Sequence, residues 1–217
     1  MIMSLSVGPL GVDVYLWQCA PGRCVVVDPG AEPARILGAL DREGLEPALI
    51  ALTHGHLDHT AALPALLDAL RARGIRPPVA IHRADARYLG PEGEETNRRI
   101  FADIGGRGYF ERFKVGLPSA DVLLEDGDLL PGTRFRVIHT PGHSSGSSCY
   151  YDEAEGVLVA GDTLFRRGIG RTDTFDGDPE LIARSIRERL FTLPRETRVY
   201  PGHGPATSIG AELGALD

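Results

Sequence analysis

The sequence predicts an α/β protein built from two β-sheets with helices outside both. Apolar segments of strand length occur in two blocks, one before residue 83 and one after residue 121, and segments with helical spacing accompany each block. The chain has 217 residues, of which 42% are hydrophobic, so it can bury a core of this kind within one domain.

The first block contains strand-like segments that are rich in Val, Leu and Ile and that end at Gly, Pro or Asp. They are predicted at residues 12–18, 24–27, 45–52 and 78–81. A turn at Pro21-Gly22 joins the first two strands into a hairpin. Helices are predicted at residues 34–43 and 60–73, where good helix formers recur, and Gly74 ends the second helix.

The second block repeats this pattern. Its strands are predicted at residues 122–124, 134–139, 147–151, 156–160 and 197–200. An amphipathic helix is expected at residues 179–189, with Asp178 as its N-terminal cap. Between the blocks, residues 83–118 are weakly patterned. We expect a short helix at residues 84–88, followed by either a substrate-covering segment or a plain surface insertion, within a single domain of residues 1–217.

The composition excludes several classes of protein. A net charge of −7 and a pI of 5.5 argue against nucleic acid as the main partner. No stretch approaches the roughly eighteen apolar residues of a membrane span, so we expect a cytoplasmic protein without a membrane partner. Cys19, Cys24 and Cys149 are expected to be reduced thiols, with a bridge across the first hairpin as the alternative.

The most informative segment is ThrHisGlyHisLeuAspHis at residues 53–59, which follows an apolar segment of strand length. Neutral imidazole and carboxylate are ligands of zinc and its first-row neighbours. If the segment is extended, His54, His56 and Asp58 project to one side and His59 to the other. Four donors that leave a turn in two directions can hold two adjacent metal ions.

Three further apolar segments end at a His or an Asp beside glycines. They lead to His143, Asp162 and His203. Glycine allows the chain to turn tightly and to approach another group closely. Because all four strand ends carry metal-ligand residues, we expect them to form one metal centre.

Other polar residues at strand ends have a less specific pattern. Asp28 also follows a strand, and we interpret it either as a partner of a ligand histidine or its loop, or as a turn residue that bonds its own backbone. His82 and His139 are interpreted as structural.

On these residues the chain resembles the metallo-β-lactamase-fold hydrolases, from about residue 12 to about residue 210. The pattern of that family, His-x-His-x-Asp-His followed by a His, an Asp and a His, matches at all seven positions. The resemblance implies an αββα four-layer sandwich and two divalent ions: zinc, with iron or a zinc–iron mixture as alternatives. It assigns His54, His56 and His143 to one ion, Asp58, His59 and His203 to the other, and Asp162 to a bridge between the ions. An aspartate at position 162 disfavours the β-lactamases that carry a zinc-bound cysteine there.

The segment GlyAspThrLeuPheArgArgGlyIleGlyArgThrAsp at residues 161–173 resembles the glyoxalase II branch, including its compact bacterial members. That resemblance implies a hydroxyacylglutathione hydrolase, or a related thioester hydrolase, that uses a hydroxide bridging two metal ions. It implies catalytic roles for Asp58 and Asp162, and it assigns Arg171 to a carboxylate of the glutathione portion. The expected partner is a small thioester, whether or not it is linked to glutathione.

Two other activities share parts of this pattern. Persulfide dioxygenases resemble the chain over residues 161–173 and bind a single iron through two His and one Asp, here His56 or His54 together with His143 and Asp162. Lactone hydrolysis is the third alternative. The complete second set of ligands favours hydrolysis over the dioxygenase reaction.

Overall fold

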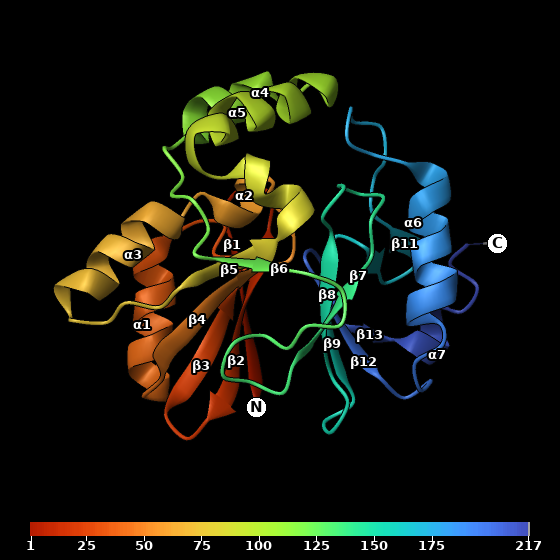
Figure 1. Cartoon of the computed structure of the whole chain (residues 1–217), viewed down its shortest axis with the longest axis horizontal. Coiled ribbons are helices and arrows are strands. Elements are labelled where there is room, and N and C mark those ends of the chain that lie inside the picture. Colours follow the sequence, from red (N-terminus) through yellow and green to blue (C-terminus); the bar gives the residue numbers. More distant parts are fainter. Residues whose placement is uncertain (217) are drawn as a thin grey trace.

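Two β-sheets pack face to face in the computed structural model, which describes residues 1–216, and helices cover both outer faces (Figure 1). The predicted αββα sandwich is therefore confirmed. The first sheet has the strand order β1-β2-β3-β4-β5-β6, and β3, β4, β5 and β6 are parallel. Its strands are Ile2–Val7 (β1), Val12–Ala20 (β2), Arg23–Val27 (β3), Glu46–Leu52 (β4), Val79–His82 (β5) and Val122–Leu124 (β6).

The second sheet has the order β13-β12-β9-β8-β7, in which only β12 and β9 are parallel neighbours. Its strands are Arg136–His139 (β7), Ser148–Asp152 (β8), Val157–Gly161 (β9), Arg198–Pro201 (β12) and Thr207–Ser208 (β13). A small ribbon of Leu164–Phe165 (β10) and Gly168–Ile169 (β11) follows β9.

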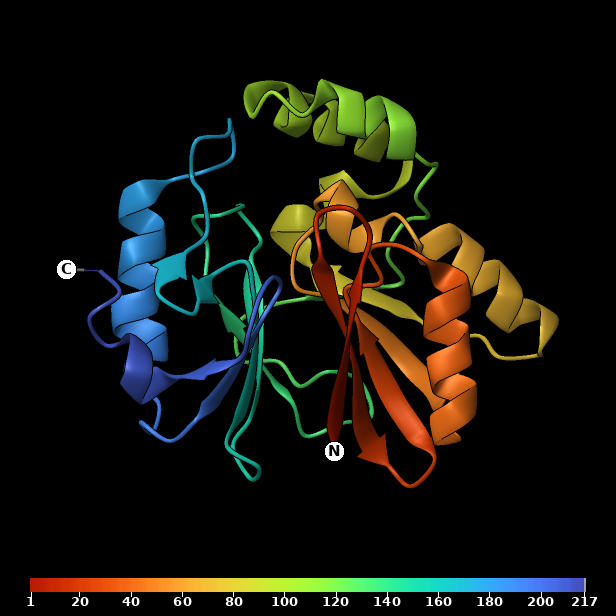
Figure 2. The same ribbon diagram turned by 180° about the vertical axis from the view of Figure 1, so that it is seen from behind.

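Helices Pro33–Glu43 (α1) and Leu63–Ala72 (α3) lie on the first sheet. Helix Pro179–Ser185 (α6) continues as a π-helical turn, Ile186–Leu190 (η3), and lies on the second sheet with Ile209–Glu212 (α7). Figure 2 shows α1 and α6 on opposite outer faces. The predicted cap is present, because the Asp178 carboxylate accepts hydrogen bonds from the backbone N–H groups of Glu180 and Leu181.

The uniformly apolar central strands are explained by burial on both faces. In β3, Val25 and Val27 face the inter-sheet core, whereas Cys24 and Val26 face the helices. In the inter-sheet core, Trp17 of β2 stacks on Phe135, which immediately precedes β7, with ring centroids 3.7 Å apart. The two sheets are therefore joined by an aromatic contact as well as by interdigitated aliphatic side chains.

Several parts of the structure differ from the prediction. Strands β1, β10, β11 and β13 and helix α7 were not predicted. The helix predicted at residues 60–73 is two helices, Leu57–Thr60 (α2) and α3, because Pro64 has no N–H and its ring would clash with the Thr60 carbonyl in one continuous helix. Residues 83–118 contain the 3₁₀ segments Arg83–Tyr88 (η1) and Gly90–Glu92 (η2) and two α-helices, Gly93–Asp103 (α4) and Arg107–Phe113 (α5).

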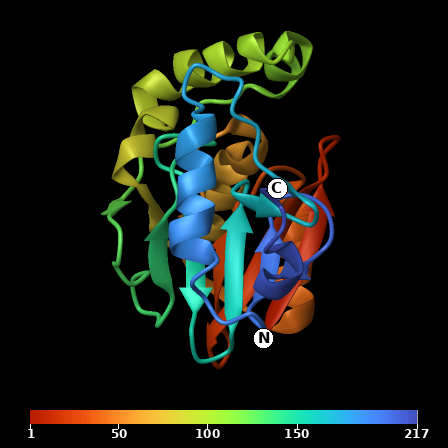
Figure 3. The same cartoon turned by 90° about the vertical axis from the view of Figure 1, so that its right-hand side faces the viewer.

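Helices α4 and α5 lie across one end of the sandwich, mainly above the first sheet and α2, and reach toward the second sheet (Figures 1 and 3). Strands β3, β4, β5, β7, β9 and β12 are among those that have their carboxyl ends at this end of the molecule (Figure 1). The loops that follow these strands therefore meet beneath α4 and α5.

Within residues 1–216, no helix combines the length and the apolar character that crossing a membrane requires. Cys19, Cys24 and Cys149 are free thiols.

The aromatic contact between the sheets gives a first prediction. Both rings are almost fully buried, so Trp17→Ala leaves a large cavity between the sheets and should lower the free energy of unfolding by about 3–5 kcal/mol. Trp17→Phe preserves an aromatic side chain and should cost less. Urea denaturation in the presence of a chelator measures both values without a contribution from bound metal. An unchanged midpoint for Trp17→Ala would contradict the role assigned to this contact.

Candidate metal centre

All seven predicted ligand residues meet beneath α4 and α5, although they come from four separate segments. His54 and His56 follow β4, and Asp58 and His59 lie in α2. The other three follow strands of the second sheet: His143 after β7, Asp162 after β9 and His203 after β12.

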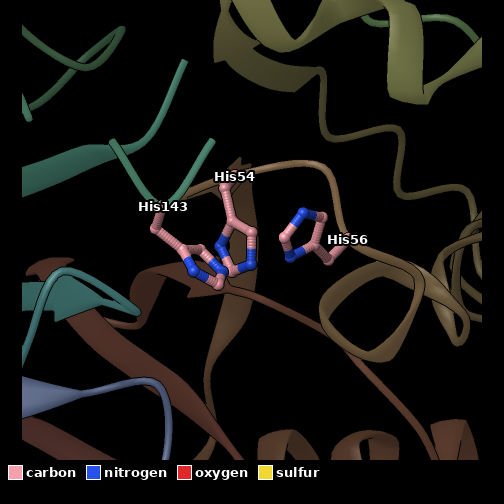
Figure 4. Close-up of side chains that lie close together, drawn as sticks. All are labelled: His54, His56 and His143. Atoms are coloured by element: carbon pink, nitrogen blue, oxygen red, sulfur yellow. The ribbon is translucent and has the colours of Figure 1, made fainter. Parts of the chain in front are cut away.

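Three histidines form one cluster, which we call the three-histidine cluster: His54, His56 and His143. Figure 4 shows their rings turned toward one another, with His143 entering from the other half of the molecule. One ring nitrogen from each lies within 4.8 Å of the others, and the three residues are 1%, 5% and 2% exposed. Within residues 1–216, no hydrogen-bond partner is found for the buried Nε2 atoms of these rings. A metal ion would satisfy such a set of orphaned imidazole nitrogens.

Asp58, His59 and His203 form a second cluster, which we call the mixed cluster, and their donor atoms also lie within 4.8 Å of one another. The Asp58 carboxylate is 3.5 Å from Nε2 of His203 and 3.8 Å from Nε2 of His59. The side chain of His203 is 28% exposed, whereas that of His59 is fully buried. The mixed cluster therefore has one side open to solvent.

Asp162 lies between the two clusters. Its Oδ1 is 3.4 Å from Nε2 of His59, and its Oδ2 is 3.7 Å from Nε2 of His143 and 3.5 Å from Nε2 of His203. Gly202 packs against this carboxylate, and a Cβ at that position would lie 2.1 Å from Oδ1. A carboxylate in this place can bind an ion on either side.

The grouping differs from the one expected for an extended segment. Because α2 begins at Leu57, Asp58 turns away from His54 and His56 and joins His59 instead. The prediction that Asp58 shares a side with the first two histidines was wrong. The four donors of residues 53–59 are nevertheless divided between two clusters, as the sequence predicted.

Several rings are oriented by a hydrogen bond at Nδ1, which leaves Nε2 directed at the centre. Nδ1 of His143 is 2.9 Å from the Arg171 carbonyl oxygen, and Nδ1 of His203 is 3.1 Å from the Leu10 carbonyl oxygen. These carbonyl acceptors are not visible as a sequence motif, because any residue type supplies one.

Asp28 performs the same function for His59. Its carboxylate is 3.1 Å from Nδ1 of His59 and also accepts hydrogen bonds from the backbone N–H and the hydroxyl of Thr53, at 2.8 and 2.6 Å. The interpretation of Asp28 as a partner of a ligand histidine and its loop therefore agrees with the geometry.

The two clusters differ in their electrostatics. Burial lowers the pKa of His54 and lowers that of His56 to about 3, so both rings are neutral at pH 7 with free lone pairs. Burial also opposes a charge on His59, but Asp162 and Asp58 outweigh it and raise the pKa of His59. The mixed cluster thus stabilises positive charge, as a cation site requires.

Arg171 is close to the centre through its backbone rather than its side chain. Its guanidinium forms a two-point ion pair with Asp173, at 2.7 and 2.8 Å, on the exposed rim. His82 and His139 stand apart from both clusters and stack on each other with ring centroids 3.9 Å apart.

Two features near His143 were missed in the sequence. Residues 142–146 have the spacing Gly-x-Ser-x-Gly of a serine nucleophile, but the Ser144 hydroxyl is fully buried and is bonded to Asp85 and Ser147. Ser144 is therefore a structural hydroxyl. Asp85 itself carried no motif, and the only signal was its place shortly after a strand end.

Comparison with known proteins agrees with this geometry. The sequence model of the "Metallo-beta-lactamase superfamily" matches residues 7–203. The "Probable metallo-hydrolase YqgX" of Bacillus subtilis is 36% identical over 96% of this chain and 92% of its own length. The "Hydroxyacylglutathione hydrolase GloC" of Haemophilus influenzae is 32% identical over 86% of this chain and 82% of its own length.

Solved structures show the same fold. The structure titled "BLEG-1 B3 metallo-beta-lactamase" superposes with a TM-score of 0.85 at 35% identity, covering 99% of this chain and 97% of that one. TTHA1623 in a di-iron-bound form superposes with a TM-score of 0.79 at 36% identity, covering 97% and 96%.

The position of Asp162 between the clusters predicts that its substitution lowers metal occupancy more than the substitution of His203 does. Elemental analysis of the wild type should find two ions per chain, one for each cluster. Asp162→Ala removes a donor near both clusters and should reduce the occupancy of both, whereas His203→Ala should spare the three-histidine cluster. Activity should fall further in Asp162→Ala than in His203→Ala. Two tightly bound ions in Asp162→Ala would contradict the bridging position.

Proposed function

The chain belongs to the metallo-beta-lactamase superfamily, whose members are metal-dependent hydrolases that bind divalent ions, and on that premise we propose that it hydrolyses small thioesters of the hydroxyacylglutathione type. The observation that carries the proposal is the complete mixed cluster beside the three-histidine cluster, with Asp162 between them. A single-ion enzyme would need only one of these sets.

The thioester part of the proposal has two supports. Residues 161–173 resemble the glyoxalase II branch, and GloC, a relative with that activity in its name, matches most of the chain. We propose zinc as the native metal, with iron or a zinc–iron pair as the alternative that the di-iron form of TTHA1623 supports.

When bound, two divalent ions would lower the pKa of a water molecule and stabilise negative charge on the substrate carbonyl oxygen. The contribution of the chain is to hold its donors in place before substrate arrives. The tethers at Nδ1 of His59, His143 and His203 fix those rings. Because His203 is the most exposed of the three ligands of the mixed cluster, we propose that the substrate enters on its side, where Asp58 lies next to it.

Arg171 is proposed to bind a carboxylate at the far end of the substrate. Its guanidinium stands at the rim, and its backbone carbonyl contacts Nδ1 of His143, so the backbone from which the side chain extends is fixed relative to the centre. A substrate carboxylate would replace Asp173 as its partner. Both groups present the same two-oxygen geometry to the guanidinium.

The function is tested by measuring turnover of lactoylglutathione with enzyme that has been stripped with a chelator and reloaded with zinc. We expect hydrolysis that depends on the metal and returns after reloading. A β-lactam, a lactone and glutathione persulfide with oxygen serve as competing substrates. Oxygen uptake on the persulfide without thioester turnover would replace the proposal with the dioxygenase, and turnover confined to the β-lactam or the lactone would replace it with that activity.

Arg171→Ala should raise KM for lactoylglutathione and leave kcat near its original value, because a contact far from the scissile bond is made in the ground state and the transition state alike. A charge-assisted hydrogen bond contributes about 1.5–3 kcal/mol. Since Asp173 competes for the guanidinium, we expect the lower end, roughly a ten-fold rise in KM. Arg166→Ala removes an exposed arginine from the same segment and should change neither constant. A fall in kcat at constant KM would instead assign Arg171 to the chemical step.

A further inference from the structure

We propose that Asp85 is a positioning residue for the metal centre: its buried carboxylate joins the loop of His54 and His56 to the loop of His143 and thereby sets the geometry of the three-histidine cluster. The inference rests on the proposed function only in taking these histidines as metal ligands. It does not depend on the identity of the substrate.

Asp85 contacts both loops, with one hydrogen bond from the loop of His54 and His56 and two from the loop of His143. Oδ2 accepts hydrogen bonds from the backbone N–H of Gly55 at 3.1 Å and from the hydroxyl of Ser144 at 2.7 Å. Oδ1 accepts from the backbone N–H of Gly146 at 2.6 Å. Gly55 stands between His54 and His56 in the sequence, and Ser144 directly follows His143. One carboxylate therefore links the backbone between His54 and His56 to the loop that carries His143.

Burial makes this contact energetically demanding. Asp85 is fully buried, and burial raises the pKa of its carboxyl group to about 6. A buried carboxylate is tolerated only when hydrogen bonds replace its hydration, and here donors from both loops supply them. An apolar residue of the same size could fill the space but could not fix the distance between the loops.

Each of the two loops also has a glycine at a close approach that no larger residue permits, Gly146 against Asp85 and Gly55 against Tyr88. A Cβ on Gly146 would lie 2.6 Å from the Asp85 nitrogen and 2.7 Å from its Cβ and Cγ. On the other loop, a Cβ on Gly55 would lie 2.2 Å from the Cβ of Tyr88, and the Asn97 amide reaches the Gly55 carbonyl at 3.4 Å. The backbone of the Gly55 loop is therefore held from two sides.

Asp85 and Asp28 have matching positions in the sheet. Asp28 follows β3, Asp85 lies in η1 after β5, and both strands flank β4, whose end carries the ligand loop. Asp28 contacts His59 and therefore serves the mixed cluster. Asp85 contacts the two loops that carry the other three histidines, so the two carboxylates support different halves of the centre.

The substitution Asp85→Asn tests this role, because an amide cannot accept hydrogen bonds from Gly55 and Gly146 at the same time. If the amide oxygen accepts from Gly146 and the amide N–H₂ donates to the Ser144 hydroxyl, the N–H₂ group faces the N–H of Gly55, and two donors oppose each other. If the amide is flipped, the same conflict arises at Gly146. Either orientation loosens one of the two loops without creating a cavity.

The experiment measures zinc affinity by competition with a chromophoric chelator, together with the absorption spectrum of the cobalt-substituted protein. In Asp85→Asn we expect one of the two zinc dissociation constants to rise by about 10–100-fold, the usual effect of losing a group that orients ligands. The cobalt bands should change in position or intensity. Gly146→Ala pushes the His143 loop away from Asp85 and should also weaken zinc binding. The inference is therefore testable even if one variant folds poorly.

Asp152→Asn is the matched control. Asp152 is as buried as Asp85 and accepts hydrogen bonds from Arg134 and from backbone N–H groups, but it lies at the end of β8 away from the ligand loops. Asp152→Asn should lower thermal stability and leave zinc affinity and the cobalt spectrum unchanged. Wild-type affinity and spectrum in Asp85→Asn would overturn the inference while leaving the hydrolase proposal intact. A wild-type chain that binds no zinc or cobalt would overturn both.

Discussion

The structure depends on one constraint, the burial of imidazole and carboxylate groups at the shared end of two sheets. Removing such groups from water is costly unless each receives a partner. The mixed cluster and Asp162 partly neutralise one another, whereas the three-histidine cluster retains nitrogen atoms for which no protein partner is found within residues 1–216. The centre is therefore suited to bind a cation, and the carboxylates and carbonyls around it orient the ligand rings.

The fold brings these groups together at the ends of several strands, and they do not come from one continuous stretch of sequence. Three apolar layers, one between the sheets and one under each set of helices, fix the strands in register. Because many strands of both sheets end at the same edge, residues distant in sequence meet there, such as His59 and His203. A two-residue shift of register in one strand would displace its ligand by about 7 Å, which is larger than the whole cluster.

The sequence was informative where a regular apolar pattern ends at residues that can bind a metal. The αββα layers and the meeting of the ligand residues were predictable, because strand-end histidines beside glycine form an unusual pattern. Helices α4 and α5 were not, because polar residues interrupt their periodicity and packing decides their conformation. Strand β1 was missed although Met3, Leu5 and Val7 alternate with serines, which is the period of a strand. The helical turn at Asp58 was missed because a four-residue helix leaves almost no periodic signal. Asp85 was missed because its role arises only when two distant loops meet.

Residues 171–176 at the rim of the centre contact both a ligand histidine and the helices above it. The segment after β11 provides the carbonyl of Arg171 to the ring of His143, and four residues later its Phe175 ring lies 3.8 Å from the guanidinium of Arg99 on α4. Asp176 next accepts a hydrogen bond from a tyrosine hydroxyl of η1. The helices above the centre and a ligand histidine thus share one short segment. We therefore expect a substitution in this segment to affect the orientation of the His143 ring as well as the rim.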